Sequence, residues 1–171
     1  MDWNRHLADQ LDWHWQHQLR PRLEGLTDDE YFWEPAPDVW TVRRDGSIDW
    51  RYPPPQPEPV TTIAWRMAHI IVGVFNARSA SHFGGPPADY LTWQYAVTAD
   101  EALAQLDDAY ARWHEGVLAV DLMRPCGPAE PYPDWPFLDL VLHINREVIH
   151  HGAELALLRD LYLRRQVVPV L

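Results

Sequence analysis

Three side chains that can bind a metal recur at helical spacing near the C-terminal end of the chain. His143, Glu147 and His151 follow one another every four residues within an otherwise apolar segment. At about 100° per residue, each step of four residues turns by only about 40°, so the three side chains line one strip of a helix. Polar groups on a face that should be buried are costly unless a metal ion or a hydrogen-bonded network compensates them. This strip is the first candidate site.

A further candidate ligand, His69, lies on a different apolar segment. Helix bundles build metal sites from side chains that point inward from facing helices, so His69 could join Glu147 and His151. Two imidazoles and one carboxylate form a ligand set of catalytic zinc and of other divalent first-row metals, with positions left for water or substrate. Such a site would lower the pKa of a bound water or thiol. The alternative is that these histidines are hydrogen-bonded core residues.

The other polar candidates have weaker patterns. His143 lies at one end of the strip and His150 and Glu154 lie beside it, and each could orient a ligand, act as a base or face solvent. Of the three, His143 and Glu154 are the residues we expect to orient a ligand. No fixed spacing selects the other histidines, which we interpret as structural: His6, His14, His17, His82 and His114.

Three features outside the strip are expected to be unremarkable. Cys126 sits in a Pro-Gly loop without a CxxC partner or an evident base, so we do not expect a catalytic thiol there. Arg159 and Asp160 are interpreted as an ordinary charged helix turn. The ten tryptophans are expected to anchor the core and the loops, with a subset available to line an apolar pocket.

Length and composition indicate one globular domain over residues 1–171. A chain of 171 residues with 47% hydrophobic residues can bury a core without disulfides. One cysteine and no evident signal peptide favour the cytoplasm, and no apolar run is long enough to span a membrane. The net charge of -11 disfavours binding to nucleic acid or anionic lipid.

Hydrophobic periodicity predicts four long helices. Apolar residues recur every four positions from Leu7 to Leu19 in the first, which Pro21 could kink or end. Residues 27–34 are expected to form a short helical turn. Eight prolines and glycines over residues 35–60 then predict a loop, which we expect to pack on the domain because it contains Trp40 and Trp50.

The three later helices have recognisable starts. Thr61 or Thr62 can cap a second helix that Gly84 ends, and Thr98 opens a third as the first residue of a capping box. Asp134 is the expected cap of the fourth, which should begin near residue 136 and run to about residue 164. The class is therefore all-α, and the long connection after the first helix makes a simple array of hairpins unfavourable.

The sequence resembles the DinB-like superfamily of metal-dependent four-helix bundles. The resemblance rests on three stretches: LTDDEYFWEPAPDVWTVR, AWRMAHI and NREVIHHGAELALLRDL. A second-helix histidine combined with E-x-x-x-H on the last helix is similar to the zinc-ligand pattern of mycothiol-dependent maleylpyruvate isomerases. Residue by residue, this implies His69, Glu147 and His151 as ligands. The resemblance also implies a bundle with up-down-down-up connectivity.

The same resemblance implies thiol chemistry. Relatives use a divalent metal to activate mycothiol or another low-molecular-weight thiol, so we expect an S-transferase-like enzyme with Glu147 and His151 catalytic. Zinc is the first expectation for the metal, with nickel, manganese and iron as alternatives. The extra C-terminal domain of the isomerases has no counterpart here, which argues against isomerase activity. A metal-dependent hydrolase and a noncatalytic binding or stress protein stay open, as does a homodimer.

Overall fold

The fold is built from helical segments. The computed structural model describes residues 1–165, so the end of the expected domain lies outside the described residues. Within residues 1–165 all regular secondary structure is helical, and the β-type pairing there is limited to isolated bridges in the loops. The α-helical and π-helical (η) segments are α1 (Trp3–His14), η1 (Trp15–Leu19), α2 (Arg20–Arg22), α3 (Asp28–Tyr31), α4 (Ile63–Ala68), η2 (His69–Asn76), α5 (Ala77–Phe83), α6 (Ala99–Ala119) and α7 (Phe137–Arg164).

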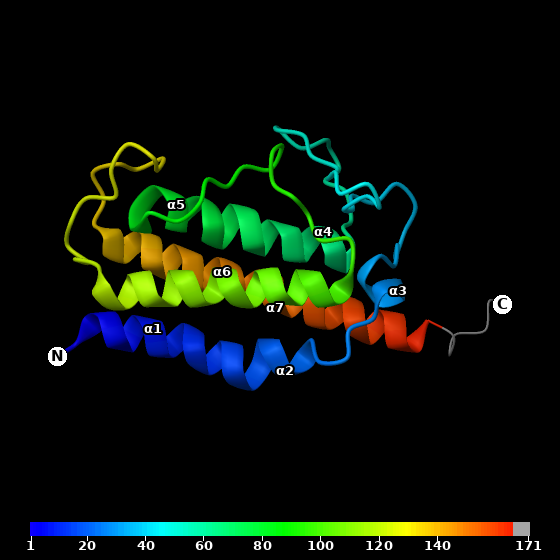
Figure 1. The fold of residues 1–171 in the computed structure, drawn as a ribbon, viewed down its shortest axis with the longest axis horizontal. Coiled ribbons are helices and arrows are strands. Elements are labelled where there is room, and N and C mark those ends of the chain that lie inside the picture. Colours follow the sequence, from blue (N-terminus) through cyan, green and yellow to red (C-terminus); the bar gives the residue numbers. More distant parts are fainter. Residues whose placement is uncertain (166–171) are drawn as a thin grey trace.

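Four long rods make up the bundle (Figure 1). The first rod is α1, η1 and α2 in direct succession, the second is α4, η2 and α5, and α6 and α7 are the third and fourth. The first and fourth rods run in one direction and the other two run in the opposite direction. Because α1 and η2 each pack against both α6 and α7, the first two rods occupy opposite corners. The expected all-α bundle of up-down-down-up connectivity is confirmed.

Two long connections make this order possible. Residues 23–62 carry the chain across one end of the bundle from α2 to α4, with α3 on the way. Residues 84–98 then run back along the bundle, so that α5 and α6 are parallel (Figure 1). The first connection was expected to be long from its composition, whereas a second connection that spans the bundle was implied only by the up-down-down-up connectivity of the resemblance.

Threonine side chains start several helices as expected. The hydroxyl of Thr62 accepts a hydrogen bond from the Trp65 amide, and that of Thr98 accepts one from the Glu101 amide. Thr27 caps α3 in the same way. Each cap satisfies one of the amide groups that a helix N-terminus leaves without a partner.

The expected cap of the fourth helix is wrong. The N-cap of α7 is Pro136, not Asp134, and it makes no side-chain hydrogen bond. Backbone carbonyls of the preceding loop take that role, because the Phe137 amide donates to Arg124 and the Leu138 amide donates to Leu122. The loop therefore satisfies the start of α7 without a capping side chain.

Tryptophans fix the first long connection to the second rod. The ring of Trp50 stacks on that of Tyr90, with centroids 3.7 Å apart, and the indole of Trp65 donates to the Asp49 carbonyl over 2.8 Å. These contacts place an irregular segment beside the N-terminal half of the second rod. The loop over residues 35–60 therefore packs on the bundle, as its tryptophans indicated.

The interpretation of Arg159 as part of an ordinary charged turn is wrong. Its guanidinium is largely buried and forms an ion pair with Glu30, which lies on α3. The partner could not be read from the local sequence because it is 129 residues away.

None of the helices in the described part of the chain is long and apolar enough to cross a membrane.

Candidate metal centre

The candidate ligands come from the second and fourth rods. His69 is the first residue of the π-helical segment η2, while Glu147 and His151 lie one turn apart on α7. Because η2 packs against α7, the two segments face each other across the bundle. π-Helical segments occur often at functional sites, since the extra residue in the turn changes the direction of a side chain. The start of η2 therefore coincides with the histidine that faces α7.

The three side chains converge on one point. Nε2 of His69 lies 3.1 Å from Nε2 of His151, and Oε2 of Glu147 lies 3.4 Å from the same His151 atom. One donor atom from each residue falls within 4.8 Å of the other two. Two ligands about 2.1 Å from a shared ion are about 3.0 to 3.4 Å apart at octahedral or tetrahedral angles. The two short separations fit joint coordination of one ion.

Outer contacts orient both imidazole rings. Nδ1 of His151 donates to Oε2 of Glu154 over 2.7 Å, so Nε2 of this ring carries a lone pair toward His69. Nδ1 of His69 lies 2.6 Å from the hydroxyl of Tyr90. If the neutral His69 ring carries its proton on Nδ1, the lone pairs of the two Nε2 atoms face each other at 3.1 Å, as they would around a shared cation. If the proton is on Nε2 of His69, it forms a hydrogen bond to Nε2 of His151. The positions of the two rings fit both tautomers of His69.

Burial keeps His69 in the neutral form that can bind a metal. Desolvation is the largest effect on this ring, and electrostatic interactions with His151 and Arg66 act in the same direction, so the pKa of His69 falls to about 3. For Glu154, burial opposes ionisation, but the hydrogen bond from His151 and the charge of Arg66 outweigh it and hold its pKa below the ordinary value. Burial raises the pKa of Tyr90, which therefore stays protonated.

A second group of possible ligands shares one of these histidines. His150, His151 and Glu154 also bring donor atoms within 4.8 Å of one another. However, Nε of Arg66 lies 2.9 Å from Oε2 of Glu154, and Nη1 lies 3.3 Å from Nδ1 of His151. The guanidinium of Arg66 at that position would repel a metal ion bound there, and it already pairs with the carboxylate of Glu154. The group formed with His69 and Glu147 is therefore the better candidate.

The flanking residues take different positions around this group. Glu154 contacts His151 directly, as expected of an orienting residue. Nδ1 of His143 lies 3.6 Å from Oε1 of Glu147, so this residue contacts the carboxylate and not the imidazoles. His150 is mostly exposed, with 65% of its side chain accessible.

Three residues at the site were not identified from the sequence. Tyr90 comes from the irregular segment between α5 and α6, where no periodicity could connect it to His69. Arg66 lies three residues before His69, a spacing that puts both on one face of the second rod. The Trp65 ring also stacks on the His69 ring, with centroids 5.5 Å apart. The spacings of Arg66 and Trp65 from His69 could have been found in the sequence, whereas the contact of Tyr90 could not.

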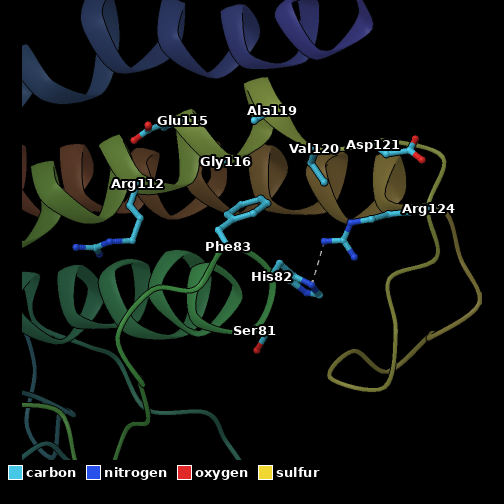
Figure 2. A pocket seen from close by; sticks show the side chains of 10 residues that line it. All are labelled: Ser81, His82, Phe83, Arg112, Glu115, Gly116, Ala119, Val120, Asp121 and Arg124. Carbon is cyan, nitrogen blue, oxygen red and sulfur yellow. Dashed lines mark hydrogen bonds between the residues drawn. The ribbon is translucent and has the colours of Figure 1, made fainter.

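Among the histidines interpreted as structural, His82 lies at a cavity that is away from the candidate centre. The volume of this cavity is about 640 Å³. Its lining side chains are drawn in Figure 2, where Phe83 lies between Arg112 and Arg124. Nε2 of His82 is 3.0 Å from Oε1 of the buried Glu130. His82 follows His69 by 13 residues, or about 20 Å along a helix, so this cavity is not the candidate metal centre.

Comparison with known proteins identifies the family. The sequence model of the DinB superfamily matches residues 10–155, which include the second and third rods, the greater part of the first and fourth, and every residue of the candidate centre. No curated protein and no solved structure gives a significant match. The match covers most of the chain and agrees with the helical bundle, and the chain therefore belongs to the DinB superfamily.

Proposed function

We propose that the protein is a metal-dependent enzyme that activates a low-molecular-weight thiol and transfers the intact thiol, through its sulfur, to an electrophilic small molecule. The observation that carries the proposal is the approach of His69 Nε2 to His151 Nε2 at 3.1 Å, with Glu147 Oε2 3.4 Å from the latter. The similarity of these three positions to the ligand pattern of mycothiol-dependent isomerases supports a thiol as the co-substrate.

The roles of the side chains follow from their contacts. His69, Glu147 and His151 would hold the ion, and Tyr90 and Glu154 would keep both imidazoles turned toward it. Glu147 supplies one negative charge to the set. When bound, a divalent metal with these ligands lowers the pKa of a thiol or water that reaches it. The donor set suits zinc and also nickel, manganese or iron.

The proposed transfer balances without a redox partner. The thiol loses its S–H proton to solvent, and the thiolate sulfur forms a bond to an electrophilic carbon. In a substitution, the bond from that carbon to the leaving group breaks and the leaving group takes both electrons. In an addition to an activated double bond, the π electrons move to the neighbouring carbon, which takes up a proton. Mycothiol or a similar thiol would be the donor.

The experiment replaces the native metal with cobalt, whose bond to sulfur absorbs in the near ultraviolet. We expect this absorption to appear when mycothiol, bacillithiol or cysteine is added, and the effective thiol to react with monochlorobimane at an enzyme-dependent rate. His151→Ala should abolish both signals, whereas His150→Ala, on the exposed side of α7, should keep them.

Two results would contradict the proposal. Full cobalt occupancy without sulfur absorption for any thiol would exclude thiol activation, and metal-dependent ester hydrolysis by the same preparation would then favour the hydrolase. Loss of both signals in His150→Ala, but not in His151→Ala, would mean that the assigned ligands are wrong.

A further inference from the structure

A smaller cavity, of about 290 Å³, opens beside the candidate metal centre. It lies between α5, the loop of residues 126–135 and the first half of α7. The buried side chains of Cys126 and Leu140 line it, together with the exposed rings of Tyr132 and Trp135, which stack 4.3 Å apart. Its volume is close to the lower end of small-molecule pockets, about 300 Å³. The cavity can therefore hold a compact ligand with an apolar or aromatic body.

Glu147 connects this cavity to the candidate metal centre. His143 lines the cavity, and its Nδ1 lies 3.6 Å from Oε1 of Glu147. The other oxygen of that carboxylate, Oε2, lies 3.4 Å from Nε2 of His151. About one helical turn, or about 6 Å, separates His143 from Glu147 along α7. A molecule bound beside His143 is thus one side chain away from the centre.

The end of the cavity near Glu147 carries the available positive charge. Arg146 lines it, and within residues 1–165 its guanidinium makes no ion pair; its Nη2 donates only to Nδ1 of His143, over 3.1 Å. The carboxylate of Asp139 also lines the cavity, but it lies about 10 Å back along α7. The charges are therefore separated along the cavity.

A second arginine at the cavity is partly neutralised. Nε of Arg78 lies 3.6 Å from Oε2 of Glu130, and Oε1 of the same carboxylate is 3.0 Å from Nε2 of His82. Glu130 is thus engaged on both oxygens and is a poor partner for a ligand. Arg146 is left as the guanidinium with free donors for an incoming anion.

We propose that this cavity binds a small organic carboxylate, with its apolar or aromatic body against Tyr132 and Trp135 and its carboxylate on Arg146. If the proposed function holds, this ligand is the electrophilic acceptor, and its position beside His143 brings it next to the activated thiol. The assignment of the acceptor rests on the proposed function, whereas binding of the carboxylate does not.

Cys126 provides a local reporter of binding because it lines the cavity and is the only cysteine of the chain. The rate at which iodoacetamide alkylates Cys126 would be measured in the full-length, metal-loaded protein without added thiol, against rising phenylpropionate. We expect saturable slowing, with half-protection at a concentration at least about tenfold lower than for phenylpropanol, because a charge-assisted contact to arginine is lost in the alcohol.

Matched variants assign the effect to the cavity. Arg146→Gln should remove the preference for the acid, whereas Arg5→Gln, an equal charge change at an exposed position on α1, should keep it. Protection that persists in His151→Ala shows that the acid is not simply a ligand of the metal. The proposal is overturned if phenylpropionate and phenylpropanol give half-protection at the same concentration. It is also overturned if Arg146→Gln keeps the preference for the acid as Arg5→Gln does, or if His151→Ala loses protection. Thiol transfer that fails while carboxylate protection persists contradicts only the proposed function.

Discussion

The hydroxyl of Tyr90 occupies the space that a side chain at Gly73 would need. A Cβ built on Gly73 would lie 1.8 Å from the Tyr90 hydroxyl oxygen, well below any real contact. The same hydroxyl lies 2.6 Å from Nδ1 of His69. The missing side chain at position 73 therefore lets an irregular segment contact a candidate metal ligand.

This relationship gives a first prediction for metal affinity. Gly73→Ala should displace the Tyr90 ring, and Tyr90→Phe should remove the hydroxyl alone. Because groups that orient a metal-bound imidazole commonly contribute tenfold or more, both variants should lower metal affinity by about 10- to 100-fold. Competition with a chromophoric chelator measures the affinity. Tyr52→Phe, at a tyrosine that is 84% exposed, is the matched control and should leave the metal affinity unchanged.

A second prediction separates the two candidate ligand groups. His151→Ala should lose tight metal binding while keeping helical circular dichroism, because a domain of this size has its own apolar core. His150→Ala should keep both metal and fold. Metal content by mass spectrometry and melting curves would be recorded on the same samples. Metal loss in His150→Ala would assign the ion to the group containing Glu154, and unfolding of His151→Ala in mild buffer would make the site structural.

The third prediction concerns the carboxylate ligand. Glu147→Gln replaces an anionic ligand by a neutral amide, which coordinates poorly and leaves the charge of the ion under-compensated. Metal affinity should fall, and thiol transfer should stay low even with metal in excess, while the denaturation midpoint changes little. Metal content, thiol binding and transfer rate would be compared on one preparation. Full occupancy with an unchanged transfer rate would refute the assigned role of Glu147.

A fourth prediction tests the ion pair between Arg159 and Glu30. Only 11% and 3% of the two side chains are exposed, and Nε of Arg159 lies 2.6 Å from Oε1 of Glu30. Removing one partner leaves a buried charge, so Arg159→Met should reduce the free energy of unfolding by about 3 kcal/mol. Urea denaturation measures the change. Arg164→Met, at an exposed position on the same helix, should have little effect.

The double variant sharpens this test. Arg159→Met combined with Glu30→Leu removes both charges, and we expect it to recover most of the lost stability because no unpaired charge remains. If the double variant is as unstable as the single one, the loss comes from the packing of the arginine side chain and from its hydrogen bonds to the carbonyls of Arg22 and Glu24, and not from an unpaired charge on Glu30.

The parts of the fold that repeat along the chain could be predicted, because helical phase is a local property. His143, Glu147 and His151 share a strip of α7 for that reason, and Thr98 caps α6 through a local pattern. The partner rod for the strip could be proposed because His69 interrupts an apolar helix.

Contacts made by loops or by distant residues could not be predicted. Tyr90 reaches His69 from a segment without a period, and the partner of Arg159 lies 129 residues away. At the start of α7, backbone carbonyls replace the expected cap of Asp134, and their position depends on how the preceding loop folds. These contacts arise only when the bundle has assembled.

The location of the candidate ligands on two rods has a consequence for local opening of the bundle. His69 and His151 are 82 residues apart, so an ion held by both would act as a cross-link between η2 and the middle of α7. Fluctuations that separate these rods would then have to break a coordination bond, whereas fraying at the start of α1 would not. Amide hydrogen exchange would therefore slow with metal along two rods only. The metal would confine its ordering effect to one side of a bundle that is already folded.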